Sequence, residues 1–113
     1  MRWMLLAALT LVGGPAAQPS RPQAAEHRCA GAAIAQAEKL LRFHFGDDDR
    51  IAIDSAVQVL PSVRNPANSN QRFDVLQVWG RIYKGEYRMR LIYARLPGQC
   101  LLMGQEVLEH ASL

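Results

Sequence analysis

Residues 73–109, FDVLQVWGRIYKGEYRMRLIYARLPGQCLLMGQEVLE, decide the fold of this chain. Apolar and polar side chains alternate along the stretch, which is the pattern of strands that bury one face. Two short breaks, Lys84-Gly85 and Pro97-Gly98, have the composition of tight hairpin turns. The stretch therefore predicts three antiparallel strands, at 73–83, 87–95 and 100–109.

The turns also predict which residues lie opposite one another, because a tight turn fixes the register of a hairpin. A two-residue loop at Lys84-Gly85 places Gly80 opposite Met89 and Trp79 opposite Arg90. A two-residue loop at Pro97-Gly98 places Glu106 opposite Met89 and turns Cys100 to the same face. A bulged turn at Gly85 would instead exchange the two faces of the strand at 73–83, and the sequence leaves this alternative open.

The residues ahead of these strands predict one helix and one more strand. Small and apolar residues recur every three or four positions over 30–45, which predicts an amphipathic helix that Gly46 ends. After Arg50 the period changes to two, which predicts a strand through Val59, and residues 61–71 are expected to form a long polar loop. The expected fold is α+β, with one N-terminal helix packed on a four-stranded antiparallel meander.

This order of elements resembles the cystatin-like and NTF2-like topologies, and the resemblance is architectural only. One short segment, Gln77-Val78-Trp79-Gly80, is similar to the Q-x-V-x-G loop of cystatins. It is one residue shorter than that loop and lies inside a predicted strand rather than at a hairpin tip. The sequence therefore does not predict a protease inhibitor, and folds of this kind carry many unrelated functions.

The composition is that of a single globular domain, with 113 residues, 50% hydrophobic and 20% charged. The formal charge of +3 is spread along the chain, so we expect no nucleic-acid partner. The sequence has no phosphate-cradling glycine loop and no nucleophile motif, and its three histidines lack ligand spacing. We therefore expect no cofactor and no metal site.

The first residues predict export. Residues 1–17 contain Arg2, then an apolar run of about nine residues, then small residues, which is the order of a secretory signal peptide. The run is about half the length that a membrane-spanning helix needs. We expect residues 18–28 to be a flexible leader and residues 29–113 to be the folded domain. The mature chain, without a transmembrane segment, is expected in a bacterial periplasm or secreted.

Two cysteines, Cys29 and Cys100, remain in the exported chain. An oxidising compartment favours a disulfide between them, which would close a loop of about 71 residues. The predicted register gives a second reason, because it turns Cys100 toward the helix that follows Cys29.

The first candidate site is the face of the sheet away from the helix, since one helix can cover only one face. In the predicted register this face carries an aromatic residue, apolar residues and three arginines, with Arg81 opposite Arg88. An anion between these arginines would relieve their repulsion. An ordinary solvated face is the alternative. We expect an envelope protein, an anionic ligand or a second copy of the chain to bind there, through Trp79, Arg81, Arg88, Arg90, Ile92 and Met103.

The second candidate site is a small pocket between helix and sheet, as in an NTF2-like enzyme. Glu106 is predicted to face the core beside Met89, where Gly80 and Gly104 leave room, and a carboxylate held away from water can act as a general base. Alternatively, Glu106 pairs with a basic residue near the end of the sheet, and the glycines bend the strands. The main hypothesis is a non-catalytic interaction or ligand-binding module, and the pocket enzyme is the alternative.

Overall fold

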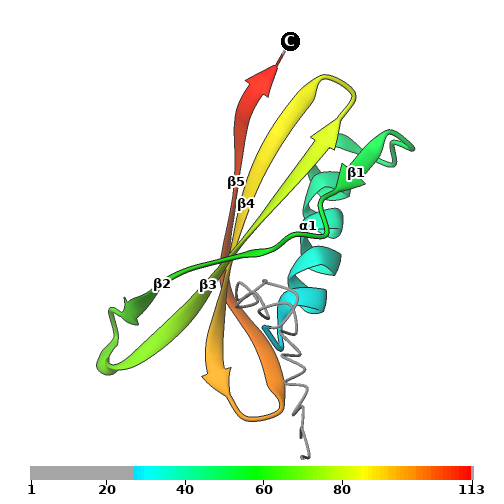
Figure 1. The fold of residues 1–113 in the computed structure, drawn as a ribbon. Coiled ribbons are helices and arrows are strands. Elements are labelled where there is room, and N and C mark those ends of the chain that lie inside the picture. Colours follow the sequence, from blue (N-terminus) through cyan, green and yellow to red (C-terminus); the bar gives the residue numbers. More distant parts are fainter. Residues whose placement is uncertain (1–26, 113) are drawn as a thin grey trace, which may run out of the picture.

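The computed structural model describes residues 27–112, in which one helix lies against an antiparallel sheet (Figure 1). The predicted signal peptide at 1–17 lies outside the described residues, as does most of the predicted leader. The α+β class with an antiparallel sheet is confirmed. No helix within the described range is both long and apolar enough to span a membrane. The elements are α1 (Ala30–Phe45), β1 (Ile51–Ile53), β2 (Gln58–Asn65), β3 (Asn68–Ile82), β4 (Gly85–Leu96) and β5 (Gln99–Ser112).

The strands follow one another across the sheet. β3 pairs with β4 and β4 pairs with β5, while β1 and β2 pair with different parts of the other edge of β3. The single strand predicted after Arg50 is therefore interrupted, which gives five strands instead of four. At the interruption, the Asp54 amide donates to the Trp79 carbonyl at 2.9 Å, and Val57 is buried in the core.

The long polar loop predicted at 61–71 is wrong, because these residues extend β2 and β3 into a hairpin arm (Figure 1). Polar side chains of the arm form hydrogen bonds with other groups of the arm. Asn65 Oδ1 accepts from the Ala67 amide at 2.9 Å, and Arg72 Nε donates to Ser62 Oγ at 2.8 Å. The register shifts beside Pro61, which cannot donate to the ladder.

The β3–β4 turn lies one residue earlier than predicted, which shifts the register of the two strands by two residues. The loop is Tyr83-Lys84, with Tyr83 at φ +54°, and Gly85 pairs with Ile82 as the first residue of β4. The Tyr87 ring packs against Gly85, and a Cβ there would lie 2.7 Å from Tyr87 Oη, so a larger residue would displace the ring. A shift of two preserves the faces, so Met89 points into the core as predicted.

The β4–β5 register is as predicted only near the turn. Tyr93 lies opposite Leu102, but a β-bulge then inserts Met103, so that Ile92 lies opposite Gly104. Beyond the bulge each β5 residue points to the face opposite the predicted one, because side chains alternate along a strand. The prediction that Glu106 lies opposite Met89 is wrong: Met89 faces Val107, and Glu106 lies opposite Arg90.

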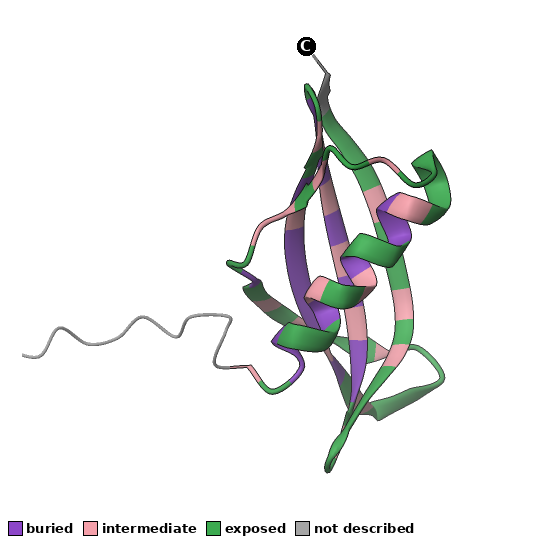
Figure 2. Cartoon of the chain, turned by 90° about the vertical axis from the view of Figure 1, so that its right-hand side faces the viewer, coloured by how far each residue is buried: buried purple, intermediate pink, exposed green. Residues whose placement is uncertain are grey.

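The core lies between α1 and the face of the sheet that the helix covers, here called the inner face (Figure 2). The helix turns Ala33, Ala37 and Leu41 toward the sheet, all at 0% exposure, and the alanines let the helix approach closely. Gly80 completes the contact, because a Cβ there would lie 2.9 Å from Leu41 Cδ1. The sheet contributes mainly Leu76, Val78, Tyr87, Met89, Leu91 and Tyr93.

Candidate functional site

The first candidate site is the face of the sheet opposite α1, here called the outer face. At one end it is apolar, with two cross-strand rows. Phe73 and Val75 in their centres are 7% and 5% exposed, although no helix covers this face, and Leu101 at the margin is 46% exposed. The curled sheet therefore buries the centre of this end. The rows are Val63, Phe73, Ala94 and Leu101, and Leu60, Val75, Ile92 and Gly104.

The next row is polar and crosses four strands, from Gln58 to Glu106. Gln77, at 7% exposure, is a buried polar side chain in its centre. Gln77 Nε2 donates to Gln58 Oε1 at 2.6 Å, and Gln77 Oε1 accepts from Arg90 Nε at 3.0 Å. Arg90 Nε also lies 3.6 Å from Glu106 Oε1. The Arg90 side chain is therefore engaged by its own sheet.

The third row contains Trp79, Arg88 and Leu108 on adjacent strands. Arg88 Nε is buried and has no hydrogen-bond partner among the described residues. Such a donor is costly because it has lost its water without gaining an acceptor. The Trp79 ring meets His110 of β5 edge-on, with centroids 5.1 Å apart, and Leu108, also on β5, is 48% exposed.

The other predicted residues of this face lie differently from the expectation. Arg81 is opposite Glu86, not Arg88, and its Nη1 lies 3.9 Å from Asp54 Oδ1. The predicted pair of opposed arginines is therefore wrong, and so is the pairing of Trp79 with Arg90. Met103 is the extra residue of the bulge and is half exposed. The shifted turn accounts for the changed partners of Arg81 and Trp79, and the bulge accounts for the position of Met103.

The four residues of the predicted pocket do not meet. Gly80 and Met89 lie on the inner face, while Gly104 and Glu106 lie on the outer face. The space at Gly80 is filled by Leu41, Met89 and Ile53 side chains, and Glu106 is exposed. Residues 27–112 include no group of three or more His, Cys, Asp or Glu side chains placed to hold a metal ion. A shallow groove of about 290 Å³ lies elsewhere, lined by Gln36, Lys39, Leu40, Phe43 and Gln105.

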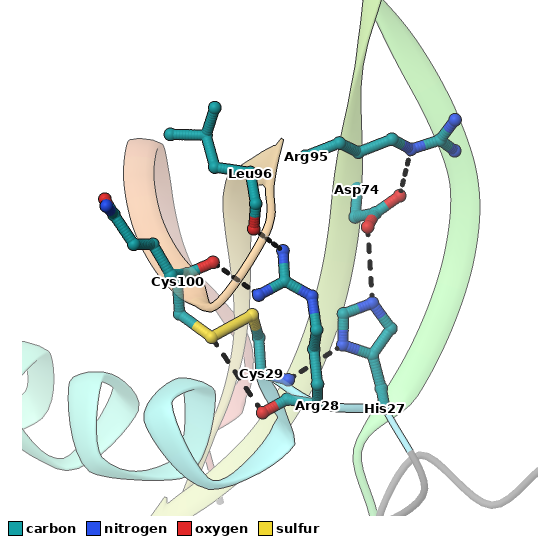
Figure 3. Close-up of polar contacts among 8 residues, drawn as sticks. His27, Arg28, Cys29, Asp74, Arg95, Leu96 and Cys100 are labelled. Carbon is teal, nitrogen blue, oxygen red and sulfur yellow. Dashed lines mark hydrogen bonds and ion pairs between the residues drawn. A yellow bond between two sulfur atoms is a disulfide. The ribbon is translucent and has the colours of Figure 1, made fainter.

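The predicted disulfide is confirmed, and it joins the start of α1 to the start of β5 with Cα atoms 5.6 Å apart (Figure 3). Arg28 holds the nearby β4–β5 turn by donating to the carbonyls of Leu96, at 2.6 Å, and of Gln99. The polar contacts of this segment thus reinforce the covalent link.

His27 ties the same segment to β3. Its Nδ1 accepts from the Cys29 amide at 3.0 Å, so the neutral ring carries its proton on Nε2. Nε2 lies 3.4 Å from Asp74 Oδ2, and Arg95 Nε donates to Asp74 Oδ1 at 2.8 Å (Figure 3). Asp74 therefore joins the segment before the helix to β4.

This carboxylate makes the stability of the fold depend on pH. Burial opposes the ionisation of Asp74, but the Arg95 and His27 contacts outweigh it and hold the pKa of Asp74 below its ordinary 3.8. The stabilisation by this carboxylate is therefore complete above about pH 5 and is lost as the pH falls through the lowered pKa. We expect Asp74→Asn to lower the melting temperature at pH 7. The melting temperature of this variant should also decrease less than that of the wild type when the pH is lowered. Asp49 is exposed, so Asp49→Asn should change neither the melting temperature at pH 7 nor its dependence on pH. Equal melting temperatures for the two variants at every pH would contradict the role of Asp74.

Comparison with protein families, curated proteins and solved structures finds no match to this chain. Sequence reasoning missed Gln77 and His110. Gln77 carried a signal, since it alternates with Val75 and Trp79 on one face of its strand, but His110 lies beyond the predicted end of the last strand.

Proposed function

We propose that this protein is an exported, non-catalytic interaction module that binds an anionic group of an envelope partner at the outer face. The observation that carries the proposal is Arg88 Nε, a buried donor with no partner among the described residues. That atom is itself buried, so a carboxylate or phosphate oxygen would approach the half-buried Arg88 guanidinium through its other nitrogens, and such charge-assisted bonds are strong. Trp79 and Leu108 flank the donor and would contact the apolar part of the partner.

The remaining residues have graded roles in this proposal. Arg90 is held by Gln77 and Glu106, so it shapes the floor of the site and adds positive charge. Ile92 and Met103 extend the apolar side, and Arg81 adds charge beyond Trp79. The pocket enzyme required Glu106 to face the core, and no observation on the described residues favours it now that Glu106 is exposed.

The proposed location is the periplasm or the extracellular space, on the strength of the signal-like residues 1–17. The disulfide is compatible with an oxidising compartment. The proposed architecture is the cystatin-like or NTF2-like one, which one helix on a curled antiparallel sheet supports.

The proposal predicts that a short polyaspartate peptide binds the oxidised protein and perturbs the NMR signals of the Trp79 indole and of Arg88 Nε–H. Arg88→Met keeps the apolar stem and removes the donors, so it should weaken binding about tenfold, as expected for loss of a charge-assisted bond. Trp79→Ala should also weaken binding. Arg64→Met removes an equal charge from an exposed position on β2 and should leave the affinity within about twofold. Equal loss in the Arg64 and Arg88 variants would reduce the binding to net charge and overturn the proposed site.

A further inference from the structure

The last strand, β5, has one edge that pairs with no other strand of the described chain. It is 14 residues long and contains neither proline nor lysine, the residues that commonly protect an edge. The opposite edge of the sheet is protected, because β1 has three residues and β2 carries Pro61. A long open edge is a template for pairing with another strand.

The inner side of this edge is also open. Helix α1 packs mainly over β1, β3 and β4, and Gln36 reaches Gln105 of β5. Phe43 on α1 is 83% exposed, and with Lys39 it lines the shallow groove whose other wall includes Gln105 of β5. A strand added to β5 would lie below this side of the helix, so the helix would cover part of it.

We propose that β5 pairs antiparallel with β5 of a second copy of this chain, about a two-fold axis at Val107. In a symmetric antiparallel pair of identical strands, one residue lies opposite itself, because opposite residues share a face. The β4–β5 ladder is regular from Gly104 to Glu109, between two irregularities. An axis at Glu106 would oppose two like charges, and an axis at Leu108 would reach the second irregularity. An axis at Val107 avoids both and pairs residues 105–109 of each copy.

Charge complementarity supports this register. Gln105 would lie opposite Glu109 of the second copy, on the inner face. The Gln36 amide donates to Gln105 Oε1 at 2.9 Å, which fixes Gln105 beside α1, where Lys39 lines the groove. The second copy's carboxylate would therefore come to the side of the helix that carries Lys39. Twofold symmetry makes this contact twice. The pairing uses neither Arg88 nor Trp79, but it includes Leu108, which borders the proposed anion site.

Sedimentation of the oxidised protein over a concentration series tests the pairing, and we expect a dimer. Glu109→Lys should raise the dimer dissociation constant about tenfold, because two ion pairs become repulsive contacts. Lys39→Glu combined with Glu109→Lys should restore wild-type association. Failure of the second change to rescue the first would overturn the register, and a monomer at millimolar concentration would overturn the dimer itself.

Disulfide trapping gives a second test of the axis. Val107→Cys should form a disulfide between two copies on mild oxidation, because the residue lies opposite itself. Leu101→Cys, exposed on the same strand but outside residues 105–109, is the matched control and should stay monomeric. Peptide mapping verifies that Cys29 and Cys100 remain bonded to each other. Equal trapping at both positions would mean random collision, and trapping at Leu101→Cys alone would place the interface elsewhere, so either result overturns the proposal.

Discussion

Replacing both cysteines, Cys29→Ala with Cys100→Ala, is expected to lower the free energy of unfolding by about 4 kcal/mol. The bond closes a loop of 71 residues, and its removal frees the unfolded chain of that constraint. Domains of this size have about 5–15 kcal/mol in total, so the loss is a large share of the stability. Cys29 is also fully buried, and its replacement removes packing at the start of the core.

Urea denaturation of the oxidised wild type and of the double variant measures this loss. Dithiothreitol provides the control, because it should destabilise the wild type to the level of the variant and leave the variant unchanged. A loss below about 1 kcal/mol would mean that the unfolded chain gains little freedom when the link is cut.

Leu41→Ala is expected to cost about 3 kcal/mol, within the range of 2–5 known for buried leucines. Leu41 is 0% exposed and occupies the place where α1 meets the sheet, with its Cδ1 against the bare Cα of Gly80. The backbone on both sides is held by helix and sheet hydrogen bonds, so the structure cannot collapse into the cavity.

Leu101→Ala is the matched control, because it makes the same chemical change at a residue that is 46% exposed at the margin of the outer face. It should cost less than about 1 kcal/mol. Both variants are compared with wild type by urea denaturation at one protein concentration. Equal losses would contradict the placement of the core between α1 and the inner face.

The helix and the faces of β3 and β4 could be predicted because each rests on a long repeat. The apolar positions of Ala30–Phe45 span more than four turns, so a local error does not change the buried side. The faces of β3 and β4 are as predicted although the turn is not, since moving the turn by one residue shifts the register by two and preserves the alternation. The cross-strand partner of each residue differs from the prediction, so Trp79 lies opposite Arg88 instead of Arg90.

The position of Glu106 could not be predicted from alternation, because one inserted residue reverses every position after it. Nothing in the sequence around Met103 marks it as the extra residue of a bulge. The sequence could thus indicate which face of the sheet is the candidate site. It could not predict the row of Trp79, Arg88 and Leu108, because this row depends on both the position of the turn and the bulge. The buried amide of Gln77 depended on Gln58 reaching it across strands.

The disulfide also determines how the chain carries mechanical tension. A pull applied ahead of Cys29 and resisted at the C-terminal end passes through the sulfur bridge directly to Cys100 and along β5. The 70 residues between the cysteines, including α1 and β1 to β4, lie off this path. Stretching the oxidised protein therefore puts β5 under tension along its own length, and it can extend the chain by no more than the segments outside the bridge.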